Sequence, residues 1–160
     1  MTKTLEQGLA ALSGDIVIGE WLYTADGGVA ELYTNNTGSA SVKGTVVIID
    51  PTDGAGVVVA PAGAPDFIGV VYEDGVADGQ PVRVVVRGDA YMLLEDSTAS
   101  TIGYWVGISE TQNGRVDATL AAPAGGTIAE LNRHFEEIGH CRETKTAGTD
   151  VLCLVHMHFN

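Results

Sequence analysis

Three histidines near the end of the chain are the residues best placed to do chemistry. His156 and His158 are two residues apart, so in a β-strand both imidazoles point to one face, and His140 could lie on the adjoining strand. Three such nitrogens could bind zinc. However, the sequence places no carboxylate beside them, and Leu152 and Leu154 share their face. We therefore predict surface or interface histidines with no metal ligand and no cofactor; a zinc site is the alternative.

Nucleophilic catalysis has one local candidate, the neighbouring residues His140 and Cys141. Adjacent residues of a strand point to opposite faces, so these two side chains are not expected to meet. The acids that could form a carboxylate pair lie in or near turns, where carboxylates accept backbone hydrogen bonds: Asp50, Asp53, Glu73, Asp74 and Asp78. Gly125 and Gly126 lack the lysine and the spacing of a phosphate-binding loop. We predict a protein that is not an enzyme and has no catalytic residues.

The elements that would position these residues are predicted to be β-strands. The chain has 160 residues, enough for about one domain with a hydrophobic core. It contains 21 glycines and few aromatic residues. Its valine-rich and threonine-rich runs are separated by Asp-Gly, Asn-Gly and Gly-Gly pairs, a pattern typical of short strands joined by tight turns. We predict an all-β fold.

The charge of the chain excludes some partners. Lysine and arginine number 8 against 21 aspartates and glutamates, for a net charge of −13, so the cations that neutralise nucleic-acid phosphates are missing. No apolar run is long enough to span a membrane, and residues 1–12 lack the apolar core of a signal peptide. We expect a soluble protein made in the cytoplasm. An acidic surface can favour a basic docking partner.

One hairpin pattern occurs twice, at residues 66–86 and 135–155. Ile68-Gly69 and Ile138-Gly139 open the two copies. With a one-residue deletion in the second turn, the alternating apolar residues match: Val82, Val84 and Val86 with Val151, Cys153 and Val155. Because strand side chains alternate between faces, the same face should be buried in both copies. Gly88, further along the first copy's second strand, suits a bulge or a bend.

The two cysteines fall in the second copy of the hairpin. Small core residues are the expected role for both, since Cys153 belongs to an alternating apolar series. If the hairpin is symmetric about Ala147, however, Cys141 and Cys153 lie opposite each other, where a cross-strand disulfide is possible. The register that decides between these alternatives cannot be read from the pattern.

Two segments depart from the strand pattern. Residues 1–14 carry Leu5, Leu9 and Leu12 at helical spacing and are predicted to form an N-terminal arm, separate from a single β-rich domain at 15–160. Residues 127–138 combine a helix-capping pattern with helical apolar spacing, although the second hairpin requires a strand at their end. We favour a helical turn near 127–132 and a strand from about Phe135, hence at most one short helix.

Short motifs in three places resemble the capsid decoration, or cement, proteins of tailed bacteriophages. They are Lys43-Gly44-Thr45-Val46-Val47, Ile68-Gly69-Val70-Val71-x-Glu73 with Gly79-x-x-Val82, and Ile138-Gly139 through Glu143 with Ala147-Gly148-Thr149-Asp150-Val151-Leu152 and His158-Phe159-Asn160. The resemblance implies a compact β-barrel or β-tulip domain, a non-catalytic structural role at the outer capsid surface of the virion, the major capsid protein as partner, and a homotrimer.

The expected contacts with capsid or neighbouring subunits come from the arm and the residues after it. An arm that orders on contact covers a large surface, so its apolar anchors would be Leu5, Leu9, Leu12, Trp21 and Tyr23. Alternatively, the two aromatic residues fill the core. A second function stays open, a β-module that binds a carbohydrate, a metal or a receptor. That module would show exposed loop aromatics, for which Tyr104-Trp105 is the one hint, although strand packing with one ring in and one out explains it as well.

Overall fold

The computed structural model describes residues 21–119 and 137–158, and these residues form ten strands and no helix, which confirms the all-β prediction. The strands are β1 (Leu22–Tyr23), β2 (Gly28–Asn35), β3 (Val46–Asp50), β4 (Asp53–Val59), β5 (Gly69–Val71), β6 (Pro81–Leu93), β7 (Trp105–Ile108), β8 (Val116–Thr119), β9 (Glu137–Cys141) and β10 (Leu152–Met157). All belong to one sheet in the order β1-β2-β4-β3-β5-β6-β10-β9-β7-β8. The segment from Glu137 is therefore strand, as favoured; the arm at 1–14 and the helical turn near 127–132 lie outside the described residues.

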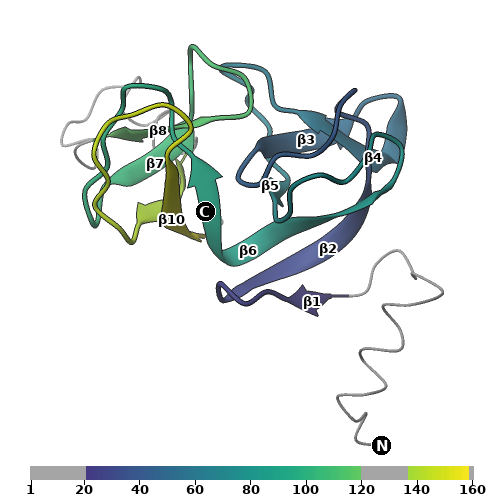
Figure 1. Cartoon of the computed structure of the whole chain (residues 1–160), viewed down its shortest axis with the longest axis horizontal. Helices are drawn as coiled ribbons and strands as arrows, with labels where there is room; N and C mark the ends of the chain where they lie inside the picture. Colours follow the sequence, from purple (N-terminus) through teal and green to yellow (C-terminus); the bar gives the residue numbers. More distant parts are fainter. Residues whose placement is uncertain (1–20, 120–136, 159–160) are drawn as a thin grey trace, which may run out of the picture.

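The sheet closes on itself twice. In the first ring, β2 pairs with β4, β4 with β3, β3 with β5, β5 with β6, and β6 again with β2. In the second ring, β6 pairs with β10, β10 with β9, β9 with β7, and β7 with β8. A parallel bridge between Leu94 and Val116 completes it. Figure 1 shows β3, β4 and β5 at one end of the molecule, β7, β8 and β10 at the other, and β6 running between them.

The two rings have the same wiring and, apart from the bulges described below, the same register. Adding 59 to the residue numbers of β2, β3 and β4 gives their counterparts in β6, β7 and β8. Adding 70 to β5 gives β9, and adding 71 to β6 gives β10. Thus Val46↔Val70 becomes Trp105↔His140, and Ala30↔Val85 becomes Asp89↔His156. The duplication inferred from the hairpins extends to the whole five-stranded ring, and β6 serves as the last strand of one ring and the first of the next.

The interiors of the rings correspond residue by residue. The core of the first ring is an all-valine cluster, and each member has a buried counterpart in the second ring: Val47, Val57, Val71, Val82, Val84 and Val86 match Val106, Val116, Cys141, Cys153, Val155 and Met157. These side chains are the alternating apolar residues of their strands, which the two-residue period places on one face. Each ring therefore has its own buried apolar centre.

A bulge redirects β6 where it passes from one ring to the other. Its pairing with β2 shifts between Val29 and Ala30, whose partners are Arg87 and Val85, so Val86 is an extra residue on β6. Gly88 follows with φ +81°, a left-handed conformation that glycine adopts without strain. A Cβ there would also lie 2.8 Å from the Gly27 carbonyl oxygen. The bulge or bend predicted at Gly88 is confirmed.

The outer faces of the rings differ. In the first ring, four outward positions are apolar and buried, and they join one cluster with the interior of the second ring: Ala30, Val46, Val70 and Val85. Their counterparts in the second ring are Asp89, Trp105, His140 and His156, all at least partly exposed. The first ring therefore uses this face for packing, whereas the second presents it to solvent. The described residues contain no helix that is long and apolar enough to cross a membrane.

Candidate functional site

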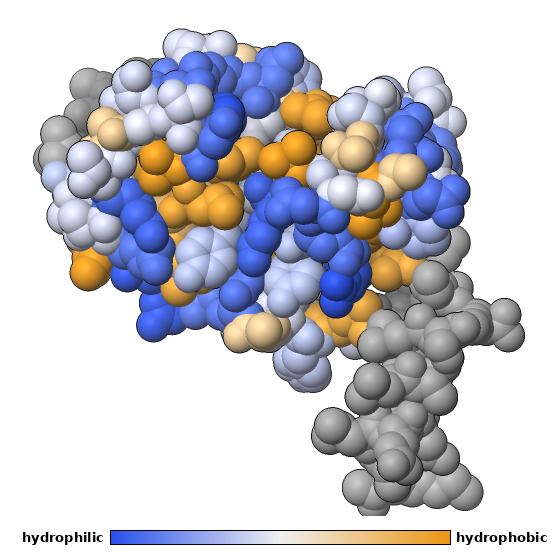
Figure 2. All heavy atoms as spheres, viewed as in Figure 1, coloured by the Kyte–Doolittle hydropathy of each residue, from blue (hydrophilic) through white to orange (hydrophobic). Residues whose placement is uncertain are grey.

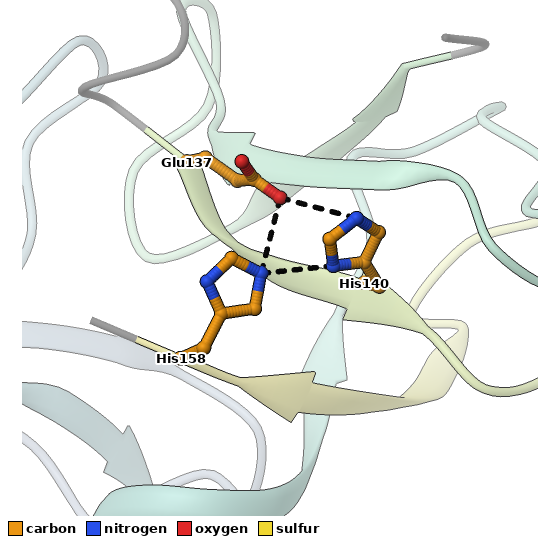
Figure 3. A group of neighbouring side chains, drawn as sticks. All are labelled: Glu137, His140 and His158. Atoms are coloured by element: carbon orange, nitrogen blue, oxygen red, sulfur yellow. Dashed lines mark hydrogen bonds and ion pairs between the residues drawn. The ribbon is translucent and has the colours of Figure 1, made fainter. Parts of the chain in front are cut away.

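The outward face of the second ring holds a cluster of two imidazoles and a carboxylate, drawn in Figure 3. The Oε1 atom of Glu137 lies 3.1 Å from Nε2 of His158 and 3.3 Å from Nε2 of His140. The two rings are hydrogen-bonded to each other, with Nε2 of His158 2.8 Å from Nδ1 of His140. The Glu137 side chain is 2% exposed, against 39% and 31% for the histidines. The carboxylate thus forms the floor of the site and the imidazoles its rim.

A second bulge brings Glu137 and His140 together. In a regular strand, residues three apart point to opposite faces. The pairing of β9 with β7 shifts, however, because Val106 faces Gly139 whereas Gly107 faces Glu137, so Ile138 is an extra residue. The extra residue restores Glu137 to the side of His140, a known way in which bulges re-aim a side chain. Trp105, the partner of His140 in β7, meets its imidazole edge-on with ring centroids 5.8 Å apart and fixes its orientation.

The three histidines named from the sequence do not meet at one point. His140 faces His156 in the strand register, but its ring contacts His158 instead. His156 bonds to Asp89, with Nδ1 2.6 Å from Oδ1, and Arg142 bonds to the other oxygen of that carboxylate, also at 2.6 Å. The argument that no carboxylate accompanies the histidines is wrong in this geometry, because Glu137 completes the cluster. Its signal was missed because it lies in the segment of ambiguous helix or strand character.

The cysteines occupy the interior of the second ring and are free thiols. Cys141 faces Val155 and Cys153 faces Met92, so the two cysteines are diagonal neighbours and the hairpin is not symmetric about Ala147. The role of small core residues holds. A hydrogen bond with Cys153, together with burial, raises the pKa of the Cys141 thiol far above its usual range. Cys141 lies on the opposite face of β9 from His140, as strand alternation predicts.

Trp21 and Tyr23 lie on the surface and not in the core. Their exposed fractions are 51% and 90%. The alternative that they fill the core is therefore wrong, and their availability for contacts stands. The guanidinium of Arg87 lies over the Trp21 ring, 4.3 Å from its centroid. The other predicted anchors, Leu5, Leu9 and Leu12, lie outside the described residues.

The positions of Tyr104, Trp105 and Asp50 agree with the sequence-based expectations. Tyr104 packs against the main core cluster whereas Trp105 contacts His140, so one ring points in and one out. Asp50 accepts hydrogen bonds from the backbone N–H and the hydroxyl of Thr52, and from Asn36. The backbone bond from Thr52 is the main cause of a lowered pKa for the Asp50 carboxyl. Asp50 therefore stabilises the turn that follows β3, as expected.

No protein-family model matches the chain, and no curated protein is similar to it at a significant level.

Proposed function

We propose that this chain is a decoration protein of a tailed-bacteriophage capsid. It binds the outer surface of the capsid and stabilises contacts between major capsid protein subunits, without catalysis. The observation that carries the proposal is the exposed aromatic edge, by which we mean Trp21 and Tyr23 at β1, placed directly after residues 1–20 and their apolar leucines. The resemblance described above supplies the partner, the place on the virion and the homotrimer.

The exposed aromatic edge has the properties of a contact surface. Tyrosine and tryptophan are enriched among the residues that carry most of an interface's binding energy. Trp21 is held beneath Arg87, so it loses little side-chain freedom on binding. Within the described residues, β1 pairs with β2 alone, which leaves its other edge open to a strand from a partner.

The rest of the surface is consistent with a particle-bound protein. On the face shown in Figure 2, apolar residues appear as separate patches between hydrophilic ones. A net charge of −13 keeps such a surface from random association and favours a basic docking site. A stable contact buries roughly 1,200–2,000 Å² in total, which favours use of an arm in addition to the edge.

A second candidate function is a ligand-binding β-module on a phage particle, for a carbohydrate, a metal or a receptor. It is favoured by the outward face of the second ring, where Trp105 and two histidines are partly exposed. The two functions use different residues. If the native chain binds a glycan and Trp105→Ala does not, the carbohydrate site lies at Trp105, whereas capsid binding should be unaffected by this change.

The decisive experiment is co-sedimentation of the purified chain with expanded capsids stripped of accessory proteins, with light scattering on the free chain. Saturable binding in a fixed ratio to the capsid protein is the expected result, and the scattering mass should be that of a trimer. The double variant Trp21→Ala/Tyr23→Ala should bind at least ~30-fold more weakly, the effect of losing about 2 kcal/mol at an interface hot spot. Ile102→Ala, which removes an exposed apolar side chain elsewhere, is the matched control and should bind normally.

Deletion of residues 1–13 tests the arm separately. The arm contributes contact area in addition to the exposed aromatic edge, so its loss should weaken capsid binding. Unchanged binding after the deletion would exclude the arm, and normal binding by the Trp21/Tyr23 double variant would exclude the edge. Failure of the intact chain to bind its cognate capsid would overturn the proposal and favour the ligand-binding module.

A further inference from the structure

We propose that Glu137, His140 and His158 form a binding site for a divalent transition metal of the zinc class. The inference is independent of the capsid role, since it uses other residues and would hold for any partner; it makes the metal alternative of the second candidate function specific. It rests on the convergence of three donor atoms, on the chemistry of the set and on a comparison with the first ring.

The geometry is close to that of a metal site. Zinc lies about 2.0–2.2 Å from nitrogen and oxygen ligands, so two ligands of a tetrahedral ion are roughly 3.4 Å apart. The contacts within the cluster are 2.8, 3.1 and 3.3 Å. One ligand atom from each residue can be chosen so that all three lie within 4.8 Å of one another. Glu137 faces Nε2 of His140 and His158 faces Nδ1, so that imidazole would turn within its contact with Trp105 to present one nitrogen to a shared ion.

The chemistry of the set selects the class of metal. Two imidazole nitrogens and one carboxylate oxygen suit zinc and its first-row neighbours, whereas magnesium and calcium require mainly oxygen ligands. The carboxyl group of Glu137 is almost completely removed from water, and a divalent ion would provide a strong electrostatic partner for a carboxylate in such a place. The exposed rims of His140 and His158 leave room for a fourth ligand from solvent.

The first ring shows that the fold does not need this cluster. The counterpart of His140 in the first ring is Val70, since Val70 pairs with Val46 and Val85 as His140 pairs with Trp105 and His156. Val70 is completely buried and belongs to the main core. The same backbone arrangement therefore forms around an apolar side chain at this position. His140, which contacts the other two donors, is therefore a departure from the module and points to a binding role.

The test uses the full chain, made without a polyhistidine tag and freed of metal by a chelator. Equilibrium dialysis against Zn²⁺ should give one ion per chain, undiminished by excess Mg²⁺. Glu137→Gln and His158→Ala should each weaken Zn²⁺ binding by at least ~100-fold, because each removes a ligand. His156→Ala is the matched control. It removes an exposed histidine of β10 that bonds to Asp89, two residues before His158, and it should leave the Zn²⁺ affinity within about threefold of the native value.

A second readout separates binding from folding. Zn²⁺ should raise the melting temperature of the native chain and not that of His158→Ala, since a ligand that binds the folded state stabilises it. If Glu137→Gln fails to fold by circular dichroism, His158→Ala decides alone, because this histidine follows the last strand. Three results would overturn the proposal. The first is no bound Zn²⁺ at about 100 μM free ion, a concentration at which a typical protein zinc site is occupied. The others are native Zn²⁺ affinity in His158→Ala, and loss of Zn²⁺ binding in His156→Ala but not in His158→Ala.

Discussion

The two rings share one wiring, but four equivalent outward positions are apolar and buried in the first ring and polar or aromatic and partly exposed in the second. Their interiors correspond position by position, as Val84 and Val155 illustrate, and both members of that pair are completely buried. Outside, Val70 becomes His140 and Val85 becomes His156. The comparison separates two requirements: the interior residues are what the ring needs to close, whereas the outward residues follow from what lies against them.

The largest expected effect tests whether the rings are equivalent at their tightest backbone contacts. Gly69 and Gly139 are counterparts, and a Cβ would lie 2.4 Å from the Val85 carbonyl oxygen in one and 2.0 Å from that of His156 in the other. Each glycine-to-alanine change should force the strands apart and reduce the free energy of unfolding by about 3 kcal/mol or more, measured by urea denaturation.

Gly54→Ala is the control for this pair. A Cβ at Gly54 meets nothing within 4 Å, so the change should stay within about 0.5 kcal/mol. Tolerance of alanine at Gly139 but not at Gly69 would mean that the strand backbones are packed less closely in the second ring than in the first.

Exchange of outward residues tests the difference between the faces. Val70→His buries a polar imidazole in the core beneath the second ring and should cost about 2–3 kcal/mol of unfolding free energy. The reverse change, His140→Val, lies at a partly exposed position and leaves His158 in contact with Glu137, so it should cost less, about 1 kcal/mol. Equal costs, measured by thermal and urea unfolding, would contradict the asymmetry of the two faces.

Truncation of the interior should affect the two rings alike. Val84→Ala and Val155→Ala each remove two methyl groups from completely buried counterparts, so each should destabilise the chain by roughly 2 kcal/mol. Because β6 belongs to both rings, we expect one cooperative unfolding transition in each variant. Two separate transitions would show that the rings unfold independently.

The smallest expected effect concerns a pair of equivalent glutamates. Glu73 accepts the backbone N–H of Arg83 and Glu143 that of Leu154, at 3.2 Å in both rings. Burial opposes ionisation of Glu73, but hydrogen bonds from Arg83 outweigh it and lower its pKa; a hydrogen bond from Lys145 lowers that of Glu143.

A lowered pKa in the folded state fixes the direction of the pH dependence. The stabilisation is complete above the ordinary glutamate pKa of 4.5 and is lost as pH falls through the folded value. Glu73→Gln and Glu143→Gln should each remove less than about 1 kcal/mol at neutral pH, since both side chains are partly exposed. Urea unfolding at neutral and acidic pH checks this, and a larger loss at acidic than at neutral pH would contradict the sign.

The sequence by itself determined the features that depend on local alternation. The all-β class, the inward valines of β6, the bend at Gly88, and the opposite facing of His140 and Cys141 follow from side chains that alternate along a strand and from the conformational freedom of glycine. The duplicated hairpin was visible for the same reason, because its apolar parity survives a change of turn length.

Tertiary structure decided everything that alternation leaves open. The sequence match pairs Val82 with Val151, whereas the ring wiring pairs it with Cys153, a slide of two residues that preserves parity and so leaves no trace in the pattern. The slide separates the cysteines, and the extra residue at Ile138 brings Glu137 to the histidines. Both outcomes are set by strand pairing between segments distant in sequence, as is the burial of one ring's outward face and the exposure of the other's.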